Sequence, residues 1–210
     1  AKNNPPQVGY KDWSSDPIDL HILAALEKKG LKPSLPADNN SLIRRVYFDL
    51  IGLPPSSDEV HEFLNDNSDD AYEKLVDKLL SSSRFGERWA RHWMDLVRYA
   101  ESCGHEFDYP IPYATEYRDY LIRAFNNDVR YDQFAVEHIA GDLLEDPRKN
   151  QKDNYNESVI GTGFWHLHEA THAPTDVRGN EVERVDNQID VFSKAFLGLT
   201  VSCARCHDHK

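Results

Sequence analysis

The chain has 210 residues, of which 40% are hydrophobic and 29% are charged. This is enough apolar material for a folded core, so a globally disordered chain is not expected. The 36 acidic residues outnumber the 24 Lys and Arg, which gives a formal net charge of −12. A surface with this negative charge repels phosphate backbones and anionic lipid, and we therefore expect no nucleic-acid partner. No apolar run approaches the roughly 18 residues that a membrane-spanning helix needs, so no membrane-spanning helix is expected.

The beginning of the chain, AKNNPPQVGY, is polar and contains proline. It lacks the basic end, the apolar run and the small-residue cleavage site of a signal peptide. A protein whose signal has been removed and a segment cut from a longer protein would both begin in this way. We expect residues 1–12 to form an extended tail before a helical domain over residues 13–210.

Apolar residues recur at helical spacing along almost the whole chain, and the alternation of a β-strand is essentially absent. The first helix is expected to begin at Asp16 and Pro17 and to end at Gly30. Further helices are predicted over about residues 40–51, 57–64, 69–80, 86–101, 115–125, 131–144 and 181–197, with a helix or apolar segment over 158–167. Loops are predicted over residues 102–112, 145–156 and 169–180. The sequence therefore predicts an all-α protein, a multi-helix single domain of about eight helices with long loops.

Two of these helices matter for function. In the aromatic-rich helix 86–101, the expected core face consists of Trp89, Trp93, Leu96, Val97 and Ala100, and its flank of Arg88, His92, Asp95 and Tyr99. In the last helix, the residues expected to face inward are Val185, Ile189, Phe192 and Phe196.

The cysteines carry the strongest signal in the sequence. Three are too few for a disulfide-dense scaffold, and Cys103 stands alone. The run Cys203-Ala-Arg-Cys206-His207 matches C-x-x-C-H, the signature of covalent c-type haem attachment. Each thiol would add across one haem vinyl group, and His207 would become the proximal iron ligand. Chance alone gives about 0.002 such matches at this composition.

Three other uses of the same residues are the alternatives. Zinc would take Cys203, Cys206, His207 and His209, but four ligands within seven residues are far closer together than in structural zinc sites. A thioredoxin-like redox pair needs a βαβ context that a helical chain lacks. A plain structural disulfide is the third alternative. The spacing favours one covalent haem c.

The residues around this motif resemble a known family. The run GLTVSCARCHDHK is similar to the cytochrome c-like domain of planctomycete-type bacteria, an exported domain of unknown function with a C-terminal CxxCH haem motif. The other similar stretches are DPIDLHILAALEKKGLKPS, SLIRRVYFDLIGLPPSSDEV, YEKLVDKLLSSSRFGERWARHWMDLVRYAES and YRDYLIRAFNNDVRYDQFAVEHIAGDLL. The resemblance extends from about Trp13 to Lys210.

The resemblance implies an exported protein that carries haem c. Its members usually continue past the haem motif into a second large domain, which makes a C-terminal domain of the same full-length protein an expected partner. This chain ends three residues after His207, so we expect it to be the front part of something longer.

A six-coordinate electron carrier needs a second axial ligand, usually His or Met. His92 is the best single candidate, because Trp89 and Trp93 beside it would line an apolar haem pocket; a buried, hydrogen-bonded histidine is the alternative. His105, in the loop with Gly and Pro, is a weaker candidate for the distal position.

The other distal candidates are weaker as well. His168 belongs to a cluster with His166 and His172, and Met94 would raise the potential of the iron but is more often core filler. Ordinary surface histidines are expected at His21, His61 and His138. An open iron is the remaining possibility.

Arginines and acidic residues complete the candidate site. Haem propionates need donors, and Arg88, Arg91 and Arg205 are suitable, although Arg88 and Arg91 would equally form surface ion pairs. The acidic stretch 176–190 admits a calcium ion, but its spacing fits no EF-hand and a solvated helix start is preferred.

Two functions from different classes follow. The first is a monohaem electron-transfer protein; the alternative is a haem enzyme or sensor whose open iron binds peroxide or another small ligand. A third reading is that the haem only helps to hold a larger assembly together. Because haem c is assembled outside the cytoplasmic membrane, a periplasmic or cell-surface location is expected. The acidic balance predicts a redox partner with a basic docking face.

Overall fold

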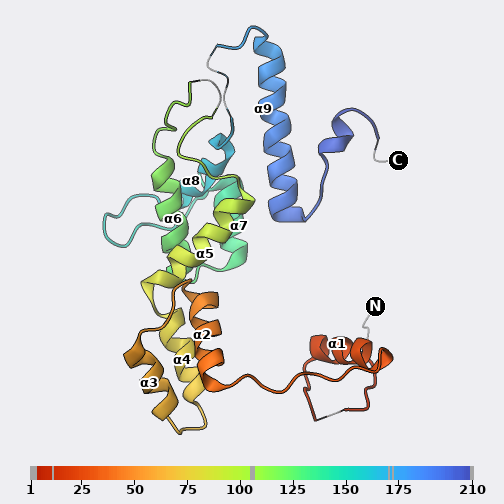
Figure 1. The fold of residues 1–210 in the computed structure, drawn as a ribbon. Helices are drawn as coiled ribbons and strands as arrows, with labels where there is room; N and C mark the ends of the chain where they lie inside the picture. The colour runs from red at the N-terminus through yellow and green to blue at the C-terminus, as the bar shows by residue number, and fades with distance from the viewer. Residues whose placement is uncertain (1–3, 11, 105–106, 170, 172, 209–210) are drawn as a thin grey trace. The chain divides into compact units, whose positions relative to one another are not determined.

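The computed structural model describes residues 4–10, 12–104, 107–169, 171 and 173–208. These residues form nine α-helices: α1 Pro17–Lys28, α2 Asn39–Leu50, α3 Ser57–Asn65, α4 Ala71–Leu80, α5 Ser83–Leu96, α6 Ala114–Asn126, α7 Tyr131–Ala140, α8 Ser158–Gly161 and α9 Val177–Phe192 (Figure 1). Single turns of other helix types are the 3-10 turns η1 Thr162–His166 and η3 Ser202–Arg205 and the π turn η2 Ser193–Leu197. Within the described part, the only β-type pairing is two isolated bridges, so the predicted all-α class is confirmed.

The chain divides into two compact units, residues 1–42 and residues 43–210. In the first unit, the side chain of Asp16 caps α1 by accepting a hydrogen bond from the amide of Ile18 at 2.8 Å. The carboxylate of Glu27 accepts hydrogen bonds from the amides of Gly9 and Tyr10, at 2.9 and 3.0 Å. Residues shortly before α1 are therefore bonded to the helix that follows them.

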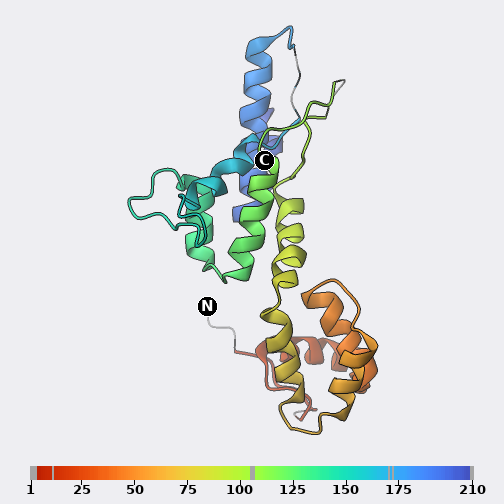
Figure 2. The same ribbon diagram turned by 90° about the vertical axis from the view of Figure 1, so that its left-hand side faces the viewer.

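The second unit begins within α2 and continues with α3 and α4, and these three short helices lie side by side (Figures 1 and 2). Helix α3 starts with a capping box, in which Ser56 and Glu59 satisfy each other's backbone amides. An ion pair of 2.9 Å between Lys78 and Glu62 joins α4 to α3. The buried apolar side chains of these helices are Ile43, Val46, Tyr47, Phe63, Leu75 and Leu79.

The main core of the second unit lies among α5, α6, α7 and η1, with α9 at its edge (Figure 2). Helices α5 and α6 cross closely at Gly86, where a Cβ atom would lie 2.4 Å from the carbonyl oxygen of Ile122. The amide of Gly86 also donates to the side chain of Asn126 at 2.8 Å. The buried members of the core are Ala90, Trp93, Val97, Ala114, Tyr117, Tyr120, Leu121, Ala124, Phe134, Phe164, Leu167 and Val191.

The aromatic-rich helix differs from its prediction in place and in face. It begins at Ser83, because Ser82 caps it, and it ends at Leu96, before the left-handed residue Arg98. Trp93 and Val97 are buried as expected, whereas Trp89, Leu96 and Ala100 are exposed, so this part of the expected core face is wrong. The reason is that α6 approaches α5 on the side of the small residues Gly86 and Ala90.

The predicted loop over residues 145–156 is also more ordered than its composition indicates. Asn150 is buried, as is Glu157 directly after the loop, and a bridge pairs Lys149 with Asn156. The side chain of Asn150 accepts hydrogen bonds from two backbone amides of its own loop, those of Lys152 and Asp153. Local hydrogen bonds of this kind leave no trace in hydrophobic periodicity.

Candidate functional site

The C-x-x-C-H residues lie on the last described turn of the chain. Cys203 and Cys206 are both exposed and free of any disulfide, and the amide of Cys206 donates to the carbonyl of Cys203 at 3.4 Å. This places the two thiols on a single turn with His207 directly after it. The spacing and exposure of these groups suit the addition of both thiols to one planar molecule.

His207 itself is exposed, and its ring has a defined orientation. Nδ1 of His207 lies 2.7 Å from the carbonyl oxygen of Asp208, so in the neutral imidazole Nδ1 carries the proton and donates it. The tautomer that results has its lone pair on Nε2, the form in which metal-bound histidines are commonly held by a carbonyl at the other nitrogen.

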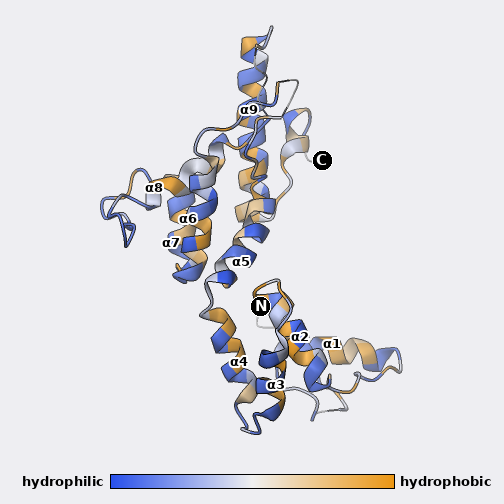
Figure 3. Ribbon diagram, turned by 60° about the vertical axis from the view of Figure 1, so that its left-hand side comes forward, coloured by the Kyte–Doolittle hydropathy of each residue, from blue (hydrophilic) through white to orange (hydrophobic). Residues whose placement is uncertain are grey.

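The chain reverses its direction after α9, which brings the C-x-x-C-H turn back beside this helix. After the π turn η2, Gly198 adopts φ +63°, a left-handed conformation that glycine adopts without strain. The amide of Leu199 then donates to the carbonyl of Ser193 at 3.0 Å. Further along, Arg205 forms an ion pair of 3.3 Å with Asp186 of α9. The segment after Gly198 therefore lies beside α9, on the side away from α6 and α7 (Figures 1 and 3).

The inward and outward faces of α9 are not those predicted. Val185 and Ile189, expected in the core, are 44% and 51% exposed, whereas Val191 is buried. Phe192 and Phe196 are partly buried, as expected. Polar groups hold the side of α9 that faces the core: Asn187 accepts from Nε of Arg98 at 2.7 Å, and Gln188 donates to the carbonyl of Trp165 at 2.9 Å.

Two of the distal candidates, His92 and His168, lie at different places in the structure. His92 is exposed on α5 and meets Trp89 edge to face, with ring centroids 5.5 Å apart. The alternative of a buried, hydrogen-bonded ring at His92 is therefore wrong. An apolar cavity of about 360 Å³ does lie beside Trp93, but its lining comes from Phe85, α6 and α7 and includes neither His92 nor Trp89.

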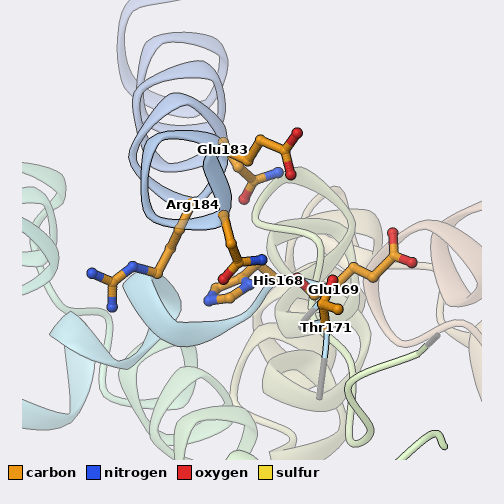
Figure 4. A pocket seen from close by; sticks show the side chains of 7 residues that line it. His168, Glu169, Thr171, Glu183 and Arg184 are labelled. Atoms are coloured by element: carbon orange, nitrogen blue, oxygen red, sulfur yellow. Dashed lines mark hydrogen bonds between the residues drawn. The ribbon is translucent and has the colours of Figure 1, made fainter. Parts of the chain in front are cut away.

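His168 lines a polar cavity of about 350 Å³ (Figure 4). Its Nδ1 lies 2.7 Å from the carbonyl oxygen of Glu169, and Glu183 and Arg184 enter the cavity from α9. Asn187 belongs to the same lining and to the core-facing side of α9. The structure therefore places His168 and Arg205 at different faces of one helix. His105, His172 and His209 lie outside the described residues.

His138 is the largest departure from prediction, since it was expected at the surface and has no exposed area. Its Nε2 accepts hydrogen bonds from the hydroxyl of Tyr117 at 2.9 Å and from Nε1 of Trp93 at 3.1 Å. Its Nδ1 donates to the carbonyl of Phe134 at 2.8 Å. Burial lowers the pKa of His138 to about 4, so the ring is neutral at ordinary pH. The lone pair of Nε2 is thus already used inside the core.

A second buried polar cluster was not predicted at all. Glu137, the neighbour of His138, is fully buried and accepts hydrogen bonds from both Nε and Nη2 of Arg148 at 3.0 Å. It also accepts from the hydroxyl of Tyr120 at 2.7 Å and from that of Ser158 at 3.0 Å. Burial alone would raise the pKa of Glu137, but the hydrogen bonds from Arg148 and Tyr120 outweigh it and hold the pKa below its ordinary value.

The same cluster extends to a second buried carboxylate. Glu157 forms ion pairs with Arg123 and, at 3.5 Å, with Arg148. Oε2 of Glu157, the oxygen that pairs with Arg148, also accepts from Nδ2 of Asn150 at 3.1 Å. Two buried carboxylates and two arginines thus balance in charge. The cluster joins α6, α7 and α8 to the loop between α7 and α8, and its role is structural.

The arginines considered for haem propionates lie apart. Arg88 packs against Gly52, after α2, and Arg91 is exposed on α5. A contact with α9 comes instead from Arg98, which lies two residues after the end of α5. Arg205, by contrast, lies within the C-terminal turn. Of the three, Arg205 is the one whose position fits the haem motif.

The acidic stretch before and within α9 has a local explanation. The side chain of Asp176 caps α9 by accepting a hydrogen bond from the amide of Gly179 at 2.9 Å. Across the described residues, no three His, Cys, Asp or Glu side chains come together in a way that could hold a metal ion. A search of the same residues also finds no helix long and apolar enough to cross a membrane.

Comparison with known proteins identifies a family. No curated protein matches the chain, and no solved structure matches it either. Residues 17–210, nearly the whole sequence, match the family PSCyt2. The chain therefore belongs to this family, which is described as a protein of unknown function (DUF1549).

Proposed function

We propose that this chain is a c-type haem protein that transfers single electrons. Cys203 and Cys206 would hold one covalent haem, and His207 would be its proximal ligand. The haem, when bound, supplies an iron that cycles between the ferric and ferrous states. The observation that carries the proposal is the single exposed turn on which two unbridged thiols precede His207.

The residues of the turn fit this group chemically. Each thiol would form a thioether by adding its sulfur to one carbon of a vinyl group and its hydrogen to the other, so attachment needs no oxidant. Nδ1 of His207 is already bonded to the carbonyl of Asp208, which leaves Nε2 as the nitrogen for the iron. The side chain of Arg205 is 43% exposed although it pairs with Asp186, so its guanidinium would also be accessible to a propionate.

The sequence resemblance to cytochrome c-like domains of planctomycete-type bacteria supports the same proposal. This resemblance implies that the protein is exported. We therefore propose a location in the periplasm or at the cell surface, where covalent haem is assembled. The charge of −12 favours a redox partner with a basic docking face, since complementary charge accelerates encounter. A further domain of the same protein is the second partner that we propose.

The second candidate function is a haem enzyme or sensor with an open iron. The positions of three described histidines favour it: His138 uses its lone pair within the core, His92 meets Trp89 edge to face, and His168 belongs to a polar cavity at another face of α9. An iron held by His207 alone would accept peroxide or another small ligand.

The test is expression of the chain together with a c-type haem maturation system. A pyridine haemochrome assay after acid–acetone extraction should give one covalent haem per chain. Cys103→Ala should retain it, whereas Cys203→Ala with Cys206→Ala should lose it. No covalent haem on the wild-type chain would overturn the proposal.

The visible spectrum then separates the two candidate functions. A low-spin ferric spectrum that does not change with cyanide, and a ferrous spectrum that does not change with carbon monoxide, identify an electron carrier. A high-spin spectrum that shifts with these ligands identifies an open iron site and excludes the carrier.

A further inference from the structure

The outward face of α9 carries an apolar stripe that the protein's own core does not cover. Val182, Val185 and Ile189 lie at spacings of three and four residues, which puts them on one face of the helix. They are 55%, 44% and 51% exposed. In most helices at a protein surface, apolar side chains face the core and polar side chains face solvent. Helix α9 has the opposite arrangement, because Asn187 and Gln188 face the core while the stripe faces outward. An exposed apolar face of this kind indicates that another group packs on it.

The haem motif is tied to this stripe by an ion pair. Asp186, the partner of Arg205, follows Val182 by four residues and precedes Ile189 by three, so it is the neighbour of both on the helix surface. Arg205 lies between Cys203 and Cys206 in the sequence. The ion pair therefore holds the residue between the two cysteines next to the stripe.

We propose that this stripe, Val182, Val185 and Ile189, is the seat of the porphyrin that Cys203 and Cys206 carry. The inference rests on the proposed function. A molecule joined to both thiols stays within reach of the stripe at all times, so it needs no affinity of its own to find it. From Val182 to Ile189 the helix rises about 10 Å, a length comparable with the width of a porphyrin ring.

The charge around the stripe disfavours other molecules as the group that packs on it. Glu181 and Asp186 flank the stripe, Glu183 lies on the side of the His168 cavity, and the chain as a whole carries −12. An anionic membrane surface and a second copy of this chain would both meet like charge there. A haem attached at this place brings its own apolar face, and its propionates can lie toward Arg205.

The test uses the haem-loaded chain and a matched pair of double variants. Val182→Asn with Ile189→Asn makes the stripe polar; Val136→Asn with Ile139→Asn is the control, because these α7 residues are a Val and an Ile that are 44% and 48% exposed. Both should carry one covalent haem, as in the wild type. The Soret circular dichroism, which reports a haem fixed in asymmetric surroundings, should fall at least twofold in the stripe variant and stay unchanged in the control.

A measurement without substitutions covers the case in which the stripe variant does not fold. Carbene footprinting of the wild-type chain, with haem and as the haem-free Cys203→Ala/Cys206→Ala form, should show labelling of Val182, Val185 and Ile189 at least twofold lower with haem. Val136 and Ile139 should be labelled equally in both.

The outcomes distinguish the inference from the function on which it rests. Covalent haem with unchanged Soret dichroism or unchanged labelling of the stripe overturns the seat and leaves the haem protein standing. Protection of the stripe in the haem-free form that rises with protein concentration assigns it to a second copy and also overturns the seat. A wild-type chain without covalent haem overturns both.

Discussion

The hydroxyl of Tyr117 lies 2.9 Å from Nε2 of His138, inside a core in which neither side chain is more than 3% exposed. Trp93 completes the triangle through its indole N–H, which lies 3.2 Å from the Tyr117 hydroxyl and 3.1 Å from His138. Three polar groups from α5, α6 and α7 thus satisfy one another where the three helices meet. Such a fully satisfied network fixes how helices pack, because any shift would leave a buried donor or acceptor unpaired.

Acid should weaken the fold through His138. Because the pKa of His138 falls to about 4 on burial, from an ordinary 6.5, the unfolded chain takes up a proton at a pH where the folded chain does not. Proton uptake then favours unfolding, and the free energy of unfolding falls as pH drops from 6.5 towards 4. At pH 4.5 this loss is about 2–3 kcal/mol, since one pKa unit corresponds to about 1.4 kcal/mol.

The matched variant for this prediction is His138→Gln, which keeps a donor and an acceptor but does not titrate. Urea unfolding of both proteins at pH 7.0 and 4.5 gives the comparison, in which the titration of the carboxylates cancels. The wild-type chain should lose about 2–3 kcal/mol more than the variant between the two pH values. Equal losses would show that the ring is not held neutral in the core.

Removing the charge of Glu137 should be costly. In Glu137→Gln, Arg148 stays partly buried with only the longer contact to Glu157 as its counter-charge. Loss of one partner from a buried ion pair costs about 3–5 kcal/mol, measured as the free energy of unfolding. Glu145→Gln, in the exposed part of the same loop, is the control and should change stability by less than about 0.5 kcal/mol.

A double variant tests whether the cost comes from the stranded charge. Glu137→Leu with Arg148→Met removes both charges, and it should be less destabilising than the two single changes added together. Additive losses would mean that the two side chains do not act as a pair.

Helical spacing was sufficient to predict the class of the fold and the approximate place of most helices. It failed where burial is polar. The inward side of α9 is held by Asn187 and Gln188, whose partners Arg98 and Trp165 are distant in sequence. Periodicity counts apolar residues, so it assigned the core face to Val185 and Ile189 instead.

His138 and Glu137 were missed for the same reason, since their partners come from other helices and from the loop after α7. One signal was available for His138. It follows Phe134 by four residues and so shares the face of α7 that Phe134 commits to the core. The C-x-x-C-H motif was readable because its chemistry lies within five consecutive residues and needs no tertiary partner to be recognised.

The reversal at Gly198 gives a prediction about the haem motif. In Gly198→Ala the left-handed conformation, φ +63°, costs about 1–2 kcal/mol, so the segment beside α9 should separate from it more often. Asn tolerates this conformation better, which makes Gly198→Asn the matched control. Amide hydrogen exchange at Leu199 should rise several-fold in the Ala variant and less in the Asn variant. Identical exchange in all three proteins would contradict the reversal as the anchor of this segment.

His92 can be separated from the iron by a single substitution. Because its ring is exposed on α5 and meets Trp89 edge to face, we predict that His92→Ala leaves the visible spectrum of the haem-loaded chain unchanged. His207→Ala should change that spectrum, since it removes the proximal ligand of the iron while both thioethers remain. His61→Ala, at another exposed histidine, is the control for surface changes. A change from low spin to high spin in His92→Ala alone would instead identify His92 as the distal ligand, and it would require α5 to approach the C-terminal turn when haem is bound.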